Sequence, residues 1–245
     1  MVSEKQKRLF VIACLFDKAC RDNNIKYSLA CGTMLGGIRE KGFISWDEDF
    51  DILMSIYDYN NFEKISIEYA DEFSWVSYRM NKSSPVVYAR VYEKEVDLHH
   101  LEEYPYIDIH VYVAASNDES IIKSDLNKVD FLTKCFWVKQ RKYHNIFHRR
   151  KSFIGAICKV PLVCLSTEWC AKRIESYSRK YLINNSGFQM PIQGYYKIKE
   201  VIPNKWLENY IDIVFEGRIF MVLSVYHEYL TKIYGDYMTP VKYNH

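Results

Sequence analysis

The chain is predicted to have an α+β fold, and three patterns along its 245 residues indicate this. Residues 4–23 form an amphipathic helix, because one stripe carries only apolar side chains: Leu9, Ile12, Ala13, Phe16 and Cys20. Strand-like runs rich in Val, Ile and Tyr then dominate up to about residue 115. The chain next becomes helical, and strands return in its last third. We therefore expect a single domain whose core spans about 1–115 and 195–245, with a helical insertion over about 116–194.

The elements of the first half follow in order. IKYSLA (25–30) predicts a short strand, and TMLGGIREKG predicts a short helix that begins at Thr33, since threonine is a good N-cap residue. Residues 49–54 predict a second strand, which leads into a helix over about 59–70. FSWVSYRM and VVYARVYE, separated by NKSSP, predict a hairpin, and YPYIDIHVYVA predicts a long strand.

The second half begins with helical segments between about 117 and 181. Strands are predicted near 195–202 and 211–223, with Gly217 in a turn. The last helix, over 224–234, ends at Gly235, as is typical of a glycine just past a helix C-terminus.

Composition excludes several classes of protein. The net charge is +2, so no strong positive field indicates nucleic-acid binding. The seven cysteines lack zinc-finger spacing and predict reduced thiols in a cytoplasmic protein. The N-terminal apolar run is short and continues as a helix, which argues against a signal peptide. No segment reaches the ~18 apolar residues that a membrane span needs.

The stretch GFISWDEDFDILM (42–54) carries the chemistry. On a strand, Asp49 and Asp51 share one face, while Phe50, Ile52 and Met54 share the other. Two carboxylates on one face repel each other unless a cation neutralises them, and a divalent ion with oxygen ligands, such as Mg²⁺ or Mn²⁺, suits them. The alternative is a solvated acidic strand end. A calcium-binding loop is excluded, because Ile52 and Asp58 stand where Gly and Glu would be needed.

Two further features favour a metal-dependent phosphoryl-transfer site. CGTMLGGIR places Gly32, Gly36 and Gly37 near a helix start, where bare backbone N–H groups can meet a phosphate, although glycines also mark turns. Downstream, Asp108 interrupts the apolar strand IDIHV and shares a face with His110. Three acids on neighbouring strands beside a glycine turn are typical of a two-metal site.

These residues carry a family resemblance. GTMLGGIREKGFISWDEDFDILM resembles the signature of the LicD family, YPYIDI resembles its third-acid strand, and HEYLTKIYGDYMTP resembles its C-terminal hallmark. The three motifs occur in the family's order and cover about a third of the chain. The departures are His110-Val111 in place of Phe-Pro, and Ser45 in place of proline.

The resemblance implies a nucleotidyltransferase-like (polymerase-β-like) mixed sheet flanked by helices. It also implies transfer of a phospho-alcohol, best known as phosphocholine, from a CDP-activated donor to a sugar hydroxyl. The acceptor would be a cell-surface glycan such as lipopolysaccharide, teichoic acid or capsular polysaccharide, and CMP would be released. The same acids could serve an ordinary nucleotidyltransferase that uses an NTP, so this alternative stays open, as does a non-catalytic glycan-binding protein. Retention of all three acids argues against the last.

The resemblance also implies residue roles. Asp49 and Asp51 would be metal ligands, and Asp108 would complete the metal site, act as general base, or do both. Substrate-binding roles would fall to residues of the glycine turn and to nearby charged groups: Gly32, Thr33, Gly36, Gly37, Arg39, Lys41, Asp47 and Arg90. Arg39 could instead pair with the acidic strand, and His110 could be purely structural.

A basic segment followed by an apolar one, residues 139–166, could dock on anionic lipid. That would suit a cytoplasmic enzyme held at the inner membrane face, where the lipid-linked acceptor lies. A solvated helix face followed by a core helix is the alternative.

Overall fold

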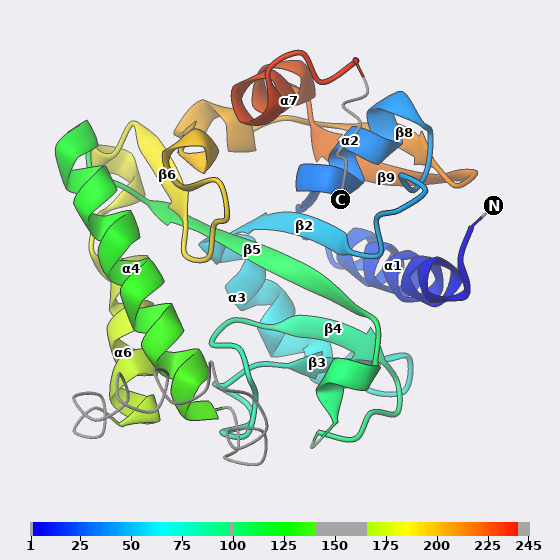
Figure 1. The fold of residues 1–245 in the computed structure, drawn as a ribbon, viewed down its shortest axis with the longest axis horizontal. Coiled ribbons are helices and arrows are strands. Elements are labelled where there is room, and N and C mark those ends of the chain that lie inside the picture. Colours follow the sequence, from blue (N-terminus) through cyan, green and yellow to red (C-terminus); the bar gives the residue numbers. More distant parts are fainter. Residues whose placement is uncertain (1, 99, 141–165, 240–245) are drawn as a thin grey trace, which may run out of the picture.

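A curled, mixed sheet flanked by helices forms the core of the protein (Figure 1). The computed structural model describes residues 2–98, 100–140 and 166–239. In that part of the chain the main sheet has seven strands: β1 (Ser28–Leu29), β2 (Phe50–Ser55), β3 (Phe73–Val76), β4 (Arg90–Glu93), β5 (Tyr106–Ala114), β6 (Phe188–Pro191) and β7 (Ile202–Pro203). A separate hairpin contains β8 (Tyr210–Phe215) and β9 (Arg218–Leu223). The predicted α+β class is confirmed.

The long strand β5 organises the main sheet. One of its edges pairs in parallel with β2. Its other edge is shared by two antiparallel neighbours, with β4 beside its first residues and β6 beside its last. Along β5, Ile107 and Ile109 are buried while Asp108 and His110 are half-buried, so the alternation predicted from the sequence is confirmed. Asp108 consequently lies at the centre of the sheet, flanked by a strand on each side.

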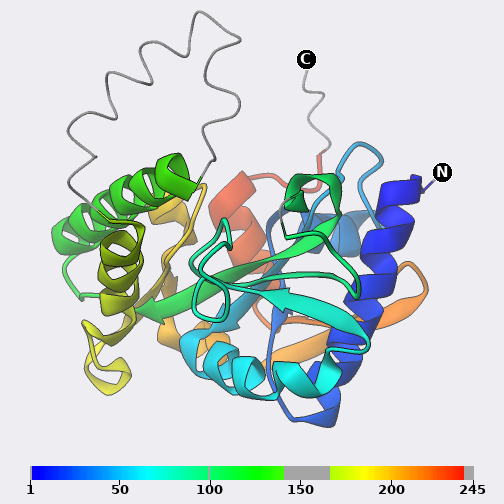
Figure 2. The ribbon, with the colours of Figure 1, turned by 90° about the horizontal axis from the view of Figure 1, so that it is seen from below.

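The helices pack around this sheet. Their bounds are α1 (Glu4–Asp22), α2 (Cys31–Arg39), α3 (Ile56–Ile65), α4 (Glu119–Gln140), α6 (Thr167–Ser176) and α7 (Tyr226–Tyr234). α1 and α3 contact strands of the main sheet, α2 contacts β2, β8 and α7, and α4 packs along α6. Figures 1 and 2 show α4 and α6 at one end of the molecule and α1 at the other. None of the helices in the described ranges is both long and apolar enough to cross a bilayer.

Helix α1 illustrates how local sequence sets the fold. The side chain of Ser3 accepts a hydrogen bond from the backbone of Gln6, and the side chain of Gln6 accepts one in return, which completes a capping box. The predicted apolar stripe is buried along its whole length. The amide of Gln6 also donates to the carbonyls of Ile44 and Asp47, so the start of α1 holds the loop that precedes β2.

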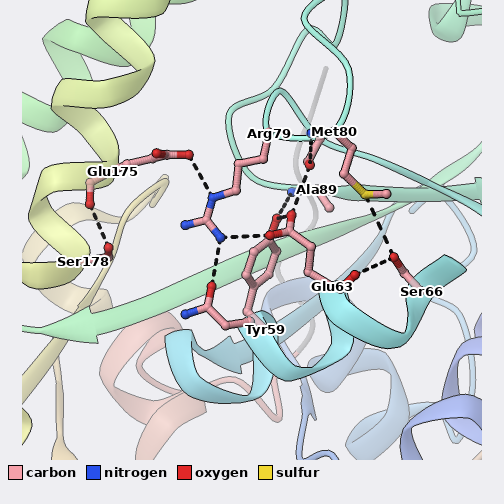
Figure 3. Close-up of polar contacts among 10 residues, drawn as sticks. Tyr59, Glu63, Ser66, Arg79, Met80, Ala89, Glu175 and Ser178 are labelled. Carbon is pink, nitrogen blue, oxygen red and sulfur yellow. Dashed lines mark hydrogen bonds and ion pairs between the residues drawn. The ribbon is translucent and has the colours of Figure 1, made fainter.

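The helical insertion is fastened to the core by Arg79. Its guanidinium donates to Glu63 of α3 at 3.0 Å and to Glu175 of α6 at 2.8 Å (Figure 3). Asn60 accepts a further bond at 2.8 Å. The hydroxyl of Tyr59 donates to Glu63. One half-buried arginine thus neutralises two glutamates from distant parts of the chain.

Three expectations about secondary structure were wrong. Residues 195–202 do not form one strand, because Lys197–Glu200 is a 3₁₀ helix and Lys197 has φ of +53°. The alternation of apolar and charged residues there imitates a strand. Strand β6 lies within the segment expected to be a helical insertion, which therefore returns to the main sheet. Helix α2 begins at Cys31 with Ala30 at the N-cap, so Thr33 lies inside the first turn.

Two other expectations concern residues 139–166 and the cysteines. Residues 141–165, which carry most of the predicted membrane-docking segment, lie outside the described residues. Five cysteines are described and all are free thiols: Cys14, Cys20, Cys31, Cys135 and Cys170.

Candidate active site

The predicted acids of two strands meet at the centre of the sheet. The parallel register of β2 and β5 places Asp51 opposite Asp108. The antiparallel register of β4 and β5 places Arg90 opposite Asp108 on the other side. Directly paired residues project from the same face of a sheet, so the three side chains form one row. Asp108 thus lies next to Asp51, and its role in the site stays a prediction.

Asp49 and Asp47 add two more carboxylates immediately before β2. Loss of solvent around the carboxyl group raises the pKa of Asp49, and the charges of Asp51 and Asp108 add to the effect. Loss of solvent also raises the pKa of Asp47 to about 6, with further contributions from Asp49 and Asp51. The charges of Asp51 and Asp108 thus act on Asp49, and those of Asp49 and Asp51 act on Asp47, so the four acids lie close together. Glu48, also before β2, is exposed and pairs with Lys5 at 3.4 Å.

The first turn of α2 is fastened to the acidic strand by two hydrogen bonds. The hydroxyl of Thr33 accepts from the backbone N–H of Asp51 at 2.8 Å. The carbonyl of Asp51 accepts from the N–H of Ala30 at 3.0 Å. Thr33 is 4% exposed, so its hydroxyl positions Asp51 and does not face a solvent-filled site. A direct substrate contact by Thr33 remains an untested prediction.

The glycines of α2 each lie against another part of the protein. A Cβ on Gly32 would stand 2.4 Å from the carboxylate of Asp47. A Cβ on Gly36 would stand 2.4 Å from the carbonyl of Gly42, and one on Gly37 would stand 2.8 Å from Ile213. Close packing thus explains why residues 36 and 37 are glycines. The phosphate contacts predicted for Gly36 and Gly37 stay predictions. Gly32 alone borders the acids.

Arg90 is committed to Asp108. Its Nε and Nη2 donate to the two carboxylate oxygens, each at 3.3 Å. Its guanidinium also lies 3.9 Å from the ring centre of Tyr106, a cation–π distance. The predicted phosphate contact would have to compete with this pairing. Tyr106 was missed from the sequence, although the alternation of YPYIDI places it on the same face as Asp108.

The two basic residues expected beside the acids lie elsewhere. Arg39 donates to Glu40 at 2.8 Å and to the carbonyl of Tyr237 at 3.2 Å. Lys41 has φ of +61° and an exposed side chain, and within the described ranges neither residue pairs with Asp47. The alternative in which Arg39 pairs with the acidic strand was therefore wrong, whereas the substrate contacts of Arg39 and Lys41 stay predictions. Lys5, which no pattern in the sequence indicated, acts on both Asp47 and Asp49, and Arg90 also acts on Asp49.

His110 contacts the acidic row directly. Its Nε2 lies 3.4 Å from Asp51 and its Nδ1 lies 3.2 Å from the carbonyl of Gln193. Burial lowers the pKa of His110, but the hydrogen bond and charge of Asp51, with the charges of Asp108 and Glu200, raise it overall to about 9. The sequence left its role open, and the structure places it within reach of Asp51.

The acidic group fits a hard divalent cation. Asp49, Asp51 and Asp108 offer only oxygen atoms, which Mg²⁺ and Mn²⁺ prefer. Arg90 is already paired with Asp108, and Lys5 is paired with Glu48. Asp49 therefore has no ion pair with a protein cation among the described residues, which agrees with its raised pKa.

Comparison with known proteins identifies the family of the chain. It is 26% identical, over 253 residues, to the lipopolysaccharide cholinephosphotransferase LicD of Haemophilus influenzae, a match that covers 96% of this chain and 90% of that protein. The family described as LicD/FKTN/FKRP, nucleotidyltransferase domain, matches residues 24–169, which include β2, β5 and the acids Asp47, Asp49, Asp51 and Asp108. The chain belongs to the LicD/FKTN/FKRP family of nucleotidyltransferase domains.

Proposed function

We propose that the protein is a metal-dependent phosphotransferase that moves a phospho-alcohol, with phosphocholine as the first candidate, from a CDP-activated donor to a sugar hydroxyl of a cell-surface glycan. The observation that carries the proposal is that Asp51 and Asp108 are directly paired in the sheet and that Asp49, immediately before β2, lies near enough to feel both charges. Membership of the LicD family and likeness to a lipopolysaccharide cholinephosphotransferase support the choice of phosphocholine and of a lipopolysaccharide-type acceptor.

In the proposed reaction, the acceptor hydroxyl oxygen attacks the phosphorus next to the alcohol. A new P–O bond forms, and the bond from this phosphorus to the oxygen shared with CMP breaks. The oxygen and its electron pair leave with CMP, while the proton of the acceptor passes to a carboxylate of the site. When bound to the acids, Mg²⁺ or Mn²⁺ would offset charge on the diphosphate and on the departing CMP.

Each residue of the site would have its own role in this reaction. Asp49 and Asp51 would hold the cation, since neither is paired with arginine or lysine in the described structure. Asp108 would complete the site or take the proton, and Arg90 limits its freedom by binding both of its oxygens. Thr33 would keep Asp51 in place through the backbone. The remaining predicted contacts, those of Gly32 and Asp47, would lie at the same edge of the site.

The decisive experiment is a screen of CDP-alcohols. CDP-choline, CDP-glycerol and CDP-ribitol would be supplied with candidate acceptor glycans, in Mg²⁺, Mn²⁺ or EDTA, and CMP release would be followed. We expect CMP release that needs the metal and rises with the correct acceptor. Transfer of NMP from an NTP with release of pyrophosphate would instead establish an ordinary nucleotidyltransferase.

Variants connect the activity to the site. Asp49→Asn and Asp51→Asn should each abolish CMP release while the protein stays folded, whereas Asp71→Asn, which alters an acid whose side chain is 96% exposed, should not. Mg²⁺ with CDP should raise the melting temperature of the wild type and of Asp71→Asn only. Wild-type turnover in both active-site variants would refute the assignment. A folded protein that stabilises with no nucleotide and turns over no donor would support a glycan-binding role.

A further inference from the structure

A buried group of three unlike side chains lies beside the acidic row. The thiol of Cys31, a ring nitrogen of His110 and a carboxylate oxygen of Glu200 all lie within 4.8 Å of one another. They come from the start of α2, from β5 and from the 3₁₀ helix Lys197–Glu200. Cys31 and Glu200 are buried and His110 is half-buried. None of the three is an acid proposed for phosphoryl transfer.

Glu200 lacks a partner for one of its oxygens. It is fully buried, and its Oε2 accepts from the backbone N–H of Tyr196 at 2.6 Å. Its Oε1 is buried without a hydrogen bond in the described part of the chain. A buried carboxylate costs free energy unless a donor or a positive charge compensates it, and this burial raises the pKa of Glu200. The charge of His110 opposes this shift in part, and the unpaired oxygen is still available to a cation.

Cys31 has an unusual backbone conformation for its residue type. Its φ is +45°, in the left-handed region that residues with a side chain seldom adopt. Strained conformations of this kind persist where the surrounding structure holds them, and they concentrate at functional sites. The hydroxyl of Tyr229 lies 3.8 Å from the sulfur and could donate to a thiolate.

The segment around Gln193 contacts and orients the side chains of His110 and Glu200. Its backbone carbonyl can only accept a hydrogen bond, so Nδ1 of His110 donates to it and the ring is held in one orientation. The next residue, Gly194, lies so close to Glu200 that a Cβ there would stand 2.5 Å from Oε2. Such outer contacts are typical of groups that orient metal ligands.

We propose that Cys31, His110 and Glu200 form a binding site for a transition-metal ion of the zinc class, separate from the proposed magnesium site. A thiolate, an imidazole and a carboxylate are the ligand types that Zn²⁺ combines, whereas Mg²⁺ avoids sulfur. Tetrahedral zinc ligands stand roughly 3.4–3.8 Å apart, as its bond lengths require, so the three donors need to close by roughly 1 Å. Water could occupy the fourth position, since Asp51, which contacts His110, is assigned to the magnesium site.

The site would join three elements that surround the catalytic acids. It would hold the start of α2, and two residues further along that helix Thr33 binds the backbone of Asp51. It would also hold β5 two residues beyond Asp108. A metal there would act as a structural support for the acidic row, and phosphoryl transfer would still take place at Asp49 and Asp51. Zinc binding should therefore raise thermal stability without nucleotide.

The test uses cobalt as a spectroscopic probe. The full-length protein would be stripped with a chelator, and Co²⁺ alone would be added under reducing conditions. Binding through Cys31 should produce a near-ultraviolet thiolate-to-cobalt charge-transfer band that saturates at one equivalent. Added Zn²⁺ should remove the band, and a large excess of Mg²⁺ should not. This readout needs no donor substrate and no activity.

Three variants and a control locate the site. Cys31→Ser should eliminate the band, and Glu200→Gln should weaken Zn²⁺ binding at least about 10–100-fold, the range for disturbed metal sites. Asp51→Asn should keep the band, because sulfur coordination does not require that acid. Cys14→Ser, a matched change in a half-buried thiol of α1, should also keep it.

Two results would overturn the proposal. The first is absence of the band in the wild-type protein, which requires no variant to fold. The second is a band that survives in Cys31→Ser, since the sulfur would then belong to another cysteine. Zn²⁺ binding that is lost in Asp51→Asn and gives no sulfur signal would mean that the ion occupies only the acidic row.

Discussion

Replacement of Thr33 by valine tests how the acidic strand is held in position. The Thr33 hydroxyl accepts the backbone N–H of Asp51 at 2.8 Å, and the residue is 4% exposed. Valine has nearly the same volume, so the change leaves no cavity and removes only the acceptor. A buried donor left without a partner costs about 1–3 kcal/mol. For a protein of this size each kcal/mol lowers the melting temperature by roughly 2–4 °C.

The measurement combines urea unfolding with ligand-dependent melting. Thr33→Ser is the matched variant, because it keeps the hydroxyl and loses one methyl group, worth about 0.8 kcal/mol. We expect Thr33→Val to be the less stable of the two. It should also lose most of the melting-temperature increase caused by Mg²⁺ with CDP, since Asp51 is no longer held. The reasoning is refuted if Thr33→Val unfolds within about 0.5 kcal/mol of the wild type, below the cost of an unmet buried donor.

Three other predictions address packing, charge and substrate contact. Arg79→Ala should lower the free energy of unfolding in urea by about 1.5–3 kcal/mol, because two half-buried glutamates lose their shared cation, whereas Lys94→Ala at an exposed ion pair should cost under about 1 kcal/mol. Gly36→Ala should destabilise the protein by at least about 1–3 kcal/mol, because its Cβ would overlap a backbone carbonyl, and calorimetry would show it. Arg90→Gln should lower kcat more than it raises KM for the donor, because the described hydrogen bonds of Arg90 go to Asp108.

Each of these has a clear contrary outcome. Equal losses for Arg79→Ala and Lys94→Ala would mean that the buried ion-pair network contributes no more than a surface pair. If the Gly36→Ala variant were as stable as the wild type but inactive, the result would support the predicted phosphate contact of Gly36. A rise in KM for the donor with unchanged kcat in Arg90→Gln would show that Arg90 contacts phosphate, as the family resemblance implied.

Elements with a strong local pattern were predictable. The stripe of α1, the alternation of β5 and the glycine after α7 each depend on residues a few positions apart, and all three appear where expected. The strand predicted for residues 195–202 was wrong because a local pattern was misleading there. Their alternation is that of a strand, but the left-handed backbone at Lys197 turns the chain, and local propensity does not reveal it.

In the site, too, residues with a local sequence pattern were predictable and residues without one were not. Family motifs and alternation indicated Asp49, Asp51 and Asp108, because each motif is contiguous and a strand fixes which of its side chains share a face. The partners of these acids come from distant segments and carry no local signal. Lys5 is near Asp47 and Asp49 because α1 crosses the loop before β2, and Arg90 pairs with Asp108 because β4 happens to be the antiparallel neighbour of β5.

The amino-acid order was therefore sufficient for the fold class, the family and the three acids, since these depend on short-range periodicity and on one long motif. It could not assign Thr33 to the backbone of Asp51, separate Arg39 from the acids, or bring Cys31, His110 and Glu200 together. Those relations join residues up to 198 positions apart, from 39 to 237, and follow from how the helices and strands pack. Packing sums many weak contacts along the whole chain, and no single stretch of sequence records it.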